Sequence, residues 1–271
     1  MTNIILNQIR KDFLWDFSYK ISFFLQFLGI FMTFITFMFI ARTFEGTNSQ
    51  FLSEYDDNYL AFSIIGIAAL DMIATITRSL NLQVREAQSF GYLDILINSN
   101  TSPIKILISC LAYPTIKSLF KLSIYFLLID LFTISESSLT LFNMFYIFLL
   151  LIFLVLPFYA LAILAASFVL KYKQADPIQY VVNIMISIFS GILYPTSVLP
   201  AWMEAISNLI PVTHILELIR LIFIGSNFNL SDSSNMIVLS SFFFTFFFII
   251  SIIVFNKTIK SVKTDGTSAT Y

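Results

Sequence analysis

Two lysines interrupt a long apolar stretch of this sequence. Lys117 and Lys121 stand four positions apart within residues 104–132, so on a helix they share one face, one turn apart. Charged side chains inside a membrane-length segment are costly and often belong to functional sites. The two lysines could therefore face a translocation pathway and attract an anionic substrate. Alternatively, Pro114 begins the membrane part, and both ammonium groups reach back to the inner interface.

A second group of polar residues lies near the C-terminal third of the chain. His214 is the only histidine, and no cluster of cysteines or further histidines accompanies it, so it does not indicate a metal site. We expect a hydrogen-bonded structural residue, with an outer gate element as the alternative. Glu217 and Arg220, three positions apart, would meet on one helix face and form a structural pair. Contact with a substrate headgroup is the alternative for this pair.

The sequence contains no recognisable catalytic motif. It has no His-Glu-x-x-His, no Gly-x-Ser-x-Gly and no paired catalytic acids in an apolar stretch. The phosphate-binding pattern Gly-x-x-x-x-Gly-Lys-Ser/Thr is also absent. We therefore expect no catalytic residue, cofactor site or metal site in this chain.

The composition predicts a protein surrounded by lipid. Hydrophobic residues make up 58% of the 271 positions and charged residues only 11%, whereas soluble domains carry about 25% charge. The mean hydropathy is +0.87. A net charge of −1 gives no bulk basicity for nucleic acid, and the single cysteine, Cys110, excludes a disulfide framework.

Six segments have the apolar character of membrane spans, for which about 20 residues are needed. Most Lys and Arg residues fall on the side of the two termini, while the outer segments hold only Arg42 and Arg220. The positive-inside rule then places both termini in the cytoplasm of a multi-pass cell-membrane protein, in the inner or plasma membrane. The predicted spans are residues 21–41, 59–77, 104–132, 141–170, 178–194 and 236–255.

The two terminal regions of the sequence lie outside these spans. Residues 1–20 place Ile5, Ile9, Phe13 and Phe17 at helical spacing, which predicts an amphipathic helix at the inner interface. Residues 257–271 are expected to form a cytoplasmic tail.

The longest cytoplasmic loop spans residues 78–103. Its first part is a polar helix that Gly91 ends, and a short apolar turn with Leu93, Ile95 and Leu96 follows. Such an apolar turn needs a partner. It packs either on another protein or, as the alternative, on the membrane surface or on its own chain.

Residues 190–225 are apolar but repeatedly broken. Short helical stretches at 201–209 and 214–224 cannot cross a bilayer, and broken helices at membrane depth occur where protein surrounds them. We expect a re-entrant helical hairpin at the outer side, over residues 195–225. The breaks fall at Gly191, Pro195, Pro200 and Pro211.

Two motifs resemble the type-2 ABC permease family, the membrane-spanning subunits of ATP-binding-cassette exporters. The motif of the loop at residues 78–103 differs from the family pattern at two positions: Tyr92 stands where the family usually has Thr, and Asp94 where it has Glu. The outer motif matches in order at Ser190, Gly191, Pro195, Leu199, Pro200, Trp202, Asn208, Pro211, Thr213, His214, Arg220 and Gly225. The loop motif matches at Arg85, Glu86, Gly91, Leu93, Leu96, Ser102 and Pro103.

The resemblance implies an all-α integral membrane fold with six transmembrane helices, an N-terminal interfacial helix, a cytoplasmic coupling helix and an outer re-entrant hairpin. Residues 21–256 would form one permease domain. Two permeases, identical or different, would enclose the pathway, and two ATPase subunits would supply the ATP and Mg sites.

The resemblance assigns ATPase coupling to the loop motif and a gate role to the outer motif. Substrates of the family include drugs, lipid-linked glycans and other amphiphiles, and a short N-terminus favours a small hydrophobic or lipid-like substrate. The alternatives are an ion-coupled secondary transporter or channel, and a membrane scaffold protein. The coupling residues are Arg85, Glu86, Gly91, Tyr92, Leu93, Asp94 and Leu96, and the gate residues are Gly191, Pro195, Pro200, Pro211, His214, Glu217 and Arg220.

Overall fold

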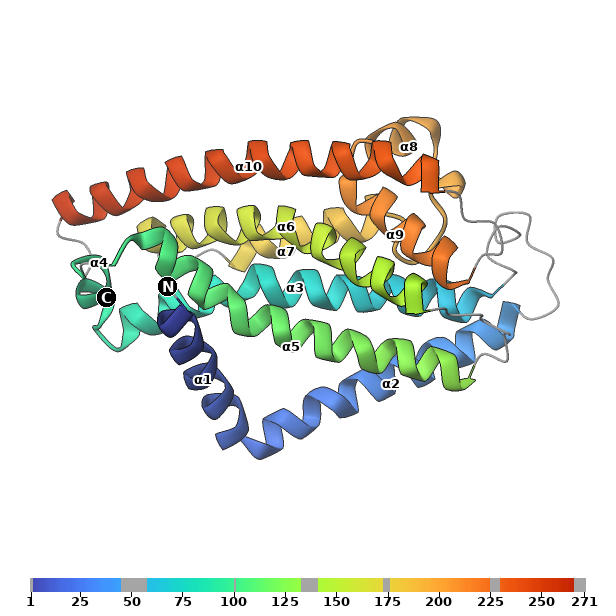
Figure 1. The fold of residues 1–271 in the computed structure, drawn as a ribbon, viewed down its shortest axis with the longest axis horizontal. Coiled ribbons are helices and arrows are strands. Elements are labelled where there is room, and N and C mark those ends of the chain that lie inside the picture. The colour runs from blue at the N-terminus through green and yellow to red at the C-terminus, as the bar shows by residue number, and fades with distance from the viewer. Residues whose placement is uncertain are drawn as a thin grey trace.

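The computed structural model describes residues 2–44, 58–99, 101–132, 141–172, 176–224 and 230–265. This part of the chain is helical and contains no strand (Figure 1). The elements are α1 Thr2–Ser18, α2 Lys20–Phe44, α3 Tyr59–Ser89, α4 Leu93–Ile97, α5 Pro103–Phe132, α6 Leu141–Tyr172, α7 Asp176–Phe189, the 3-10 turn η2 Thr196–Val198, α8 Ala201–Ser207, α9 Pro211–Phe223 and α10 Leu230–Asp265.

Four of these helices are long and apolar enough to cross a membrane, as expected of a multi-pass integral membrane protein. They are parts of α2, α3, α6 and α10, and a fifth would result if α8 and α9, bent by 85°, were one broken span. The backbone explains why helices dominate, because lipid offers no hydrogen-bond partner to an unpaired N–H or C=O group.

The number of six spans stays a prediction because two helices are ambiguous. α5 has sufficient length at 30 residues but carries Lys117 and Lys121 in its middle. α7 has only 14 residues. At 1.5 Å per residue this is roughly 21 Å, shorter than the hydrocarbon core of about 30 Å.

α3 is the central helix of the bundle. It packs against α5 on one side and α6 on another, and α10 packs on α6 (Figure 1). Small residues in its N-terminal half, Ala61, Gly66, Ala68 and Ala69, are buried. Such residues let neighbouring backbones approach closely, which is how membrane helices gain packing energy.

The regions that carry the two sequence motifs lie at the two ends of this bundle (Figure 1). α1, α4 and the C-terminal end of α10 gather at one end, and α8 and α9 lie at the opposite end (Figure 1). Helix α1 forms as predicted and meets α2 at a sharp angle after Ser18. Its aromatic residues Phe13, Trp15 and Phe17 remain about half exposed, as suits a helix that lies against lipid headgroups.

The predicted C-terminal tail is helical over its first part. α10 continues without a break from the apolar segment through Lys257 and ends at Asp265. Residues 266–271 lie outside the described residues. In the same way α3 extends to Ser89, so the polar part of the predicted loop at residues 78–103 is its continuation.

Candidate functional site

A glycine turn separates α4 from α3. Gly91 has φ +72°, in the left-handed region where glycine carries no steric penalty. The amides of Phe90 and Gly91 donate to the carbonyl oxygens of Glu86 and Gln88 at 2.9 and 3.2 Å, which closes the last turn of α3. The prediction that Gly91 ends this helix is confirmed, and Arg85 and Glu86 lie in the final turns before it.

The single turn of α4 has an inner and an outer apolar side. Leu93 is buried at 5% exposure, and Leu96 lines a cavity beneath the helix. Ile95, by contrast, is 73% exposed, and Phe90, which follows the last residue of α3, is 69% exposed. Leu93 and Leu96 thus anchor α4 to its own chain. Ile95 and Phe90, which were not among the predicted coupling residues, form the outward apolar surface, here called the α4 tip.

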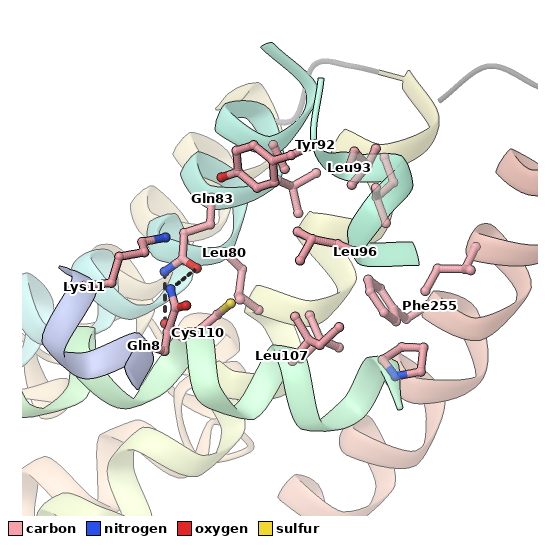
Figure 2. A pocket seen from close by; sticks show the side chains of 16 residues that line it. Gln8, Lys11, Leu80, Gln83, Tyr92, Leu93, Leu96, Leu107, Cys110 and Phe255 are labelled. Atoms are coloured by element: carbon pink, nitrogen blue, oxygen red, sulfur yellow. Dashed lines mark hydrogen bonds between the residues drawn. The ribbon is translucent and has the colours of Figure 1, made fainter. Parts of the chain in front are cut away.

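The cavity beneath α4 has a volume of about 140 Å³. Figure 2 shows Lys11, Gln8, Gln83 and Tyr92 on one side of it and Leu93, Leu96 and Phe255 on the other. A chain of hydrogen bonds fixes the polar side. Gln8 Nε2 lies 3.4 Å from Gln83 Oε1, and Gln83 Nε2 donates to the carbonyl oxygen of Cys110 at 3.1 Å.

The two lysines in the middle of α5, Lys117 and Lys121, form ion pairs within the chain. Lys121 Nζ lies 3.0 Å from Asp71 Oδ2 of α3. Lys117 pairs with Asp16 of α1, and the hydroxyl of Tyr113 donates to the same carboxylate at 2.7 Å. One face of α5 is therefore tied to α1 and to α3. These pairs neutralise the two lysines, for which the sequence analysis named no partner. A role of the lysines in lining a pathway stays a prediction.

The Lys121–Asp71 pair is expected to stabilise the contact between α3 and α5. Lys121→Ala should lower the free energy of unfolding by roughly 1–3 kcal/mol, the range for hydrogen bonds to charged groups. The charge-exchanged variant Lys121→Asp/Asp71→Lys should recover most of this loss. Thermal unfolding in detergent measures both, and equal losses in the single and exchanged variants would contradict a direct pair.

Prolines begin each short segment of the outer region, as their positions predict. Pro195 precedes η2, Pro200 precedes α8, and Pro211 is the first residue of α9. Proline suits these places because its fixed φ matches the first turn, where an amide N–H has no helical acceptor. The two short helices expected in this region are present as α8 and α9, while Gly225 lies outside the described residues.

Arg220 holds this outer region against α3. Its side chain is almost fully buried, at 3% exposure. Its Nη1 and Nη2 donate to the carbonyl oxygens of Gly191 and Ile192, both at 2.8 Å, and its Nε donates to that of Phe62 at 3.2 Å. The guanidinium also lies 3.6 Å from the centre of the Phe62 ring. We call this set of contacts the Arg220 clamp.

The clamp fits the local backbone on both sides. Gly191 and Ile192 follow the C-terminal end of α7, where the helix dipole favours a cation. Gly191 adopts φ +62°, so it turns the chain there as a glycine cap. Gly66 leaves the space for Ile192 on α3, since an added Cβ would lie 2.0 Å from the Ile192 carbonyl oxygen.

His214 is bonded to the turn before α9. Its Nε2 lies 2.8 Å from the carbonyl oxygen of Asn208, which can only accept, so Nε2 carries the proton. This agrees with the expected structural role. The predicted Glu217–Arg220 pair stays a prediction. Within the described residues, no group of three or more His, Cys, Asp or Glu side chains could hold a metal ion.

Comparison of the chain with protein-family models and with curated proteins gave no match.

Proposed function

We propose that the chain is the membrane-spanning permease subunit of a type-2 ABC exporter. Two such subunits would enclose the translocation pathway, and two separate ATPase subunits would bind and hydrolyse ATP with Mg. The motifs of the loop and of the outer region support the proposal, as does the position of both motifs at the ends of one central helix. The observation that carries it is the geometry of α4.

α4 has the arrangement that a docking helix requires. Its buried Leu93 fixes the helix to the bundle, so force applied to the tip is passed on to the chain. Its exposed Ile95 and Phe90 offer an apolar surface outside the predicted spans. Paired large apolar side chains on a rigid element are typical centres of protein interfaces.

α3 joins this tip to the outer hairpin. With 31 residues at 1.5 Å each, it is roughly 46 Å long, enough to cross the bilayer as one rigid element. Its inner end leads into α4, and its outer half carries Phe62 and Gly66 of the Arg220 clamp. Movement of α4 on ATP binding would therefore be transmitted directly to the outer hairpin, which we propose acts as a gate.

A second permease copy is proposed from the uncovered face of α3. Thr75 and Arg78 follow at helical spacing along a side that the rest of the chain leaves partly or fully exposed, and Asp71, which pairs with Lys121, lies one turn before Thr75. Polar side chains on a membrane helix are stabilised by protein or by an aqueous cavity, not by lipid. This face is proposed to meet the partner permease, or the pathway between the two copies.

The orientation follows from charge. Both termini are proposed to be cytoplasmic, with α1 at the inner membrane surface and six spans formed by α2, α3, α5, α6, α7 and α10. The substrate is proposed to be a small hydrophobic or lipid-like amphiphile, a class that the family resemblance includes.

The decisive experiment is co-purification with an ATPase subunit from native membranes in mild detergent. Ile95→Asp should reduce recovery of the ATPase at least about tenfold, because a charge then enters an apolar contact. The matched control is Leu209→Asp, which makes a similar change at a 65% exposed residue in the outer region. That control should recover the ATPase at the wild-type level.

The result separates the candidate functions. Recovery of an ATPase by wild type and by Leu209→Asp, but not by Ile95→Asp, supports the exporter. Absence of any ATP-binding partner from wild type would remove the energy source, and an ion-coupled transporter, a channel or a scaffold would take its place. Equal recovery by all three proteins would place the docking surface elsewhere.

A further inference from the structure

The cavity beneath α4 combines an apolar interior with a polar rim at the inner end of the bundle. Its interior is formed by aliphatic and aromatic side chains from α3, α4, α5, α6 and α10, among them Leu80, Leu107, Leu170 and Phe255. The rim is formed by Gln8 and Lys11 of α1, by Gln83 and by Tyr92 (Figure 2). Such a cavity matches an amphiphile rather than water or a fully polar ligand.

The rim has hydrogen-bond donors to spare. The side chain of Lys11 is 54% exposed, and its contact with Asp12 at 3.5 Å uses only one of its three donors. The hydroxyl of Tyr92 makes no hydrogen bond within the described part of the chain. Burial raises the pKa of this phenol, and the charge of Glu86 raises it further, so the hydroxyl keeps its proton and can donate.

The carboxylate nearest to Lys11, that of Asp12, is already bonded within its own helix. Burial raises the pKa of Asp12, although Lys11 and a bond from Gln8 act in the opposite direction. Gln8 Nε2 lies 3.1 Å from both carboxylate oxygens, so Asp12 is already bonded from within α1. An anion at the rim would therefore meet donors from Lys11 and Tyr92.

We propose that this cavity binds one acyl chain of an anionic amphiphile, with its carboxylate or phosphate at Lys11 and Tyr92. The volume of about 140 Å³ is close to that of an apolar cavity that holds one benzene-sized molecule. The cavity therefore admits part of one acyl chain and excludes two acyl chains side by side. The inner membrane surface supplies such ligands, since its leaflet is rich in anionic lipids.

Binding here would regulate the element that carries the tip. The acyl chain of the ligand would contact Leu93 and Leu96, so an occupied cavity would hold α4 in its packed position against the bundle. The ligand site requires the inner membrane location of α1 and α4 but no ATPase. Its failure and the failure of the exporter proposal can therefore be told apart.

The test is photolabelling of the purified full chain in nanodiscs of zwitterionic lipid. The probe is octanoic acid carrying a diazirine on its chain, and labelled peptides are mapped by mass spectrometry. We expect labels on α3 between 80 and 87 and on α5 between 106 and 110. Unlabelled octanoate should compete at least about fivefold better than octylamine or methyl octanoate, because only the anion forms a charge-assisted hydrogen bond with Lys11.

Two pairs of variants define the site. Lys11→Gln should weaken competition by octanoate about five- to tenfold, whereas Lys20→Gln, an exposed lysine outside the cavity, should not. Val84→Phe should abolish labelling by filling the cavity, whereas Leu82→Phe, 48% exposed on the same helix, should leave it unchanged. Should Val84→Phe not fold, the lysine pair still decides.

A further arm identifies the source of the ligand. Nanodiscs with phosphatidylglycerol that suppress labelling would assign the site to an inner-leaflet phospholipid, and nanodiscs without this effect would assign it to a free fatty acid. Equal competition by octanoate and octylamine, or undiminished labelling of Lys11→Gln together with Val84→Phe, would overturn the proposal.

Discussion

Replacing Arg220 with alanine is expected to release the outer hairpin from α3. The carbonyl oxygens of Gly191 and Ile192 would each lose a donor, at about 1–3 kcal/mol per buried acceptor. The variant no longer buries a charge, and the desolvation cost that it avoids offsets part of the destabilisation. We therefore expect the free energy of unfolding to fall by roughly 2–4 kcal/mol, because two orphaned acceptors outweigh the charge that is removed.

The chain provides its own reporter for this effect. It has two tryptophans, Trp15 and Trp202, and Trp202 belongs to α8. In a Trp15→Phe background, thermal unfolding in detergent followed by tryptophan fluorescence therefore reports on the hairpin alone. Arg220→Ala should lower this transition clearly, whereas Arg78→Ala, an exposed arginine on α3, should leave it nearly unchanged.

The conservative variant distinguishes geometry from charge. Arg220→Lys keeps the positive charge, but an ammonium cannot reproduce three donors in the planar arrangement of a guanidinium. It should lose a large part of the stability that Arg220→Ala loses. If Arg220→Lys unfolds like the parent protein, the charge at the end of α7 would be the stabilising factor and the three hydrogen bonds would not.

The sequence was informative about features that depend on neighbouring residues along the chain. Apolar length predicted the long helices of α2, α3, α6 and α10, because lipid leaves the backbone few alternatives. Gly91 was predicted as a break, and its φ is positive, as only glycine readily allows. The three prolines of the outer region were predicted as boundaries for the same local reason.

Long-range contacts could not be predicted in this way. Spacing suggested a partner for Arg220 at Glu217, which stays a prediction, but it could not indicate the three backbone acceptors that lie 28, 29 and 158 positions away. Lys117 and Lys121 were considered as single charges, yet their partners Asp16 and Asp71 lie on helices distant in sequence. Such contacts depend on which helices pack together, and this information is not in any local pattern.

The direction of α4 shows the same limit on a smaller scale. A helix of five residues is too short for periodicity to assign an inner and an outer face. The predicted coupling residues therefore included Leu93 and Leu96 and left out Ile95, although Ile95 is the exposed one of the three. This difference matters for experiments, because a change at Leu93 would unseat α4, whereas a change at Ile95 alters only its surface.

Gly66→Ala is expected to disrupt the same hairpin from the side of α3. The added Cβ would lie 2.0 Å from the carbonyl oxygen of Ile192 and 2.6 Å from Nη2 of Arg220. A backbone oxygen cannot rotate away, so the hairpin has to move off α3 and the clamp opens. Gly29→Ala on α2 is the matched control, because its Cβ meets nothing within 4 Å and alanine favours a helix by up to about 1 kcal/mol.

The double variant Gly66→Ala/Arg220→Ala tests whether both residues act on one contact. If the clash at Gly66 acts by opening the clamp, the clamp is already lost when Arg220 is absent. The double variant should then unfold only slightly below the less stable single variant, with a coupling energy of roughly 1–3 kcal/mol. Additive losses would mean that Gly66 packs against the hairpin independently of Arg220. A Gly66→Ala protein as stable as Gly29→Ala would show that α3 and the hairpin do not approach this closely in the folded protein.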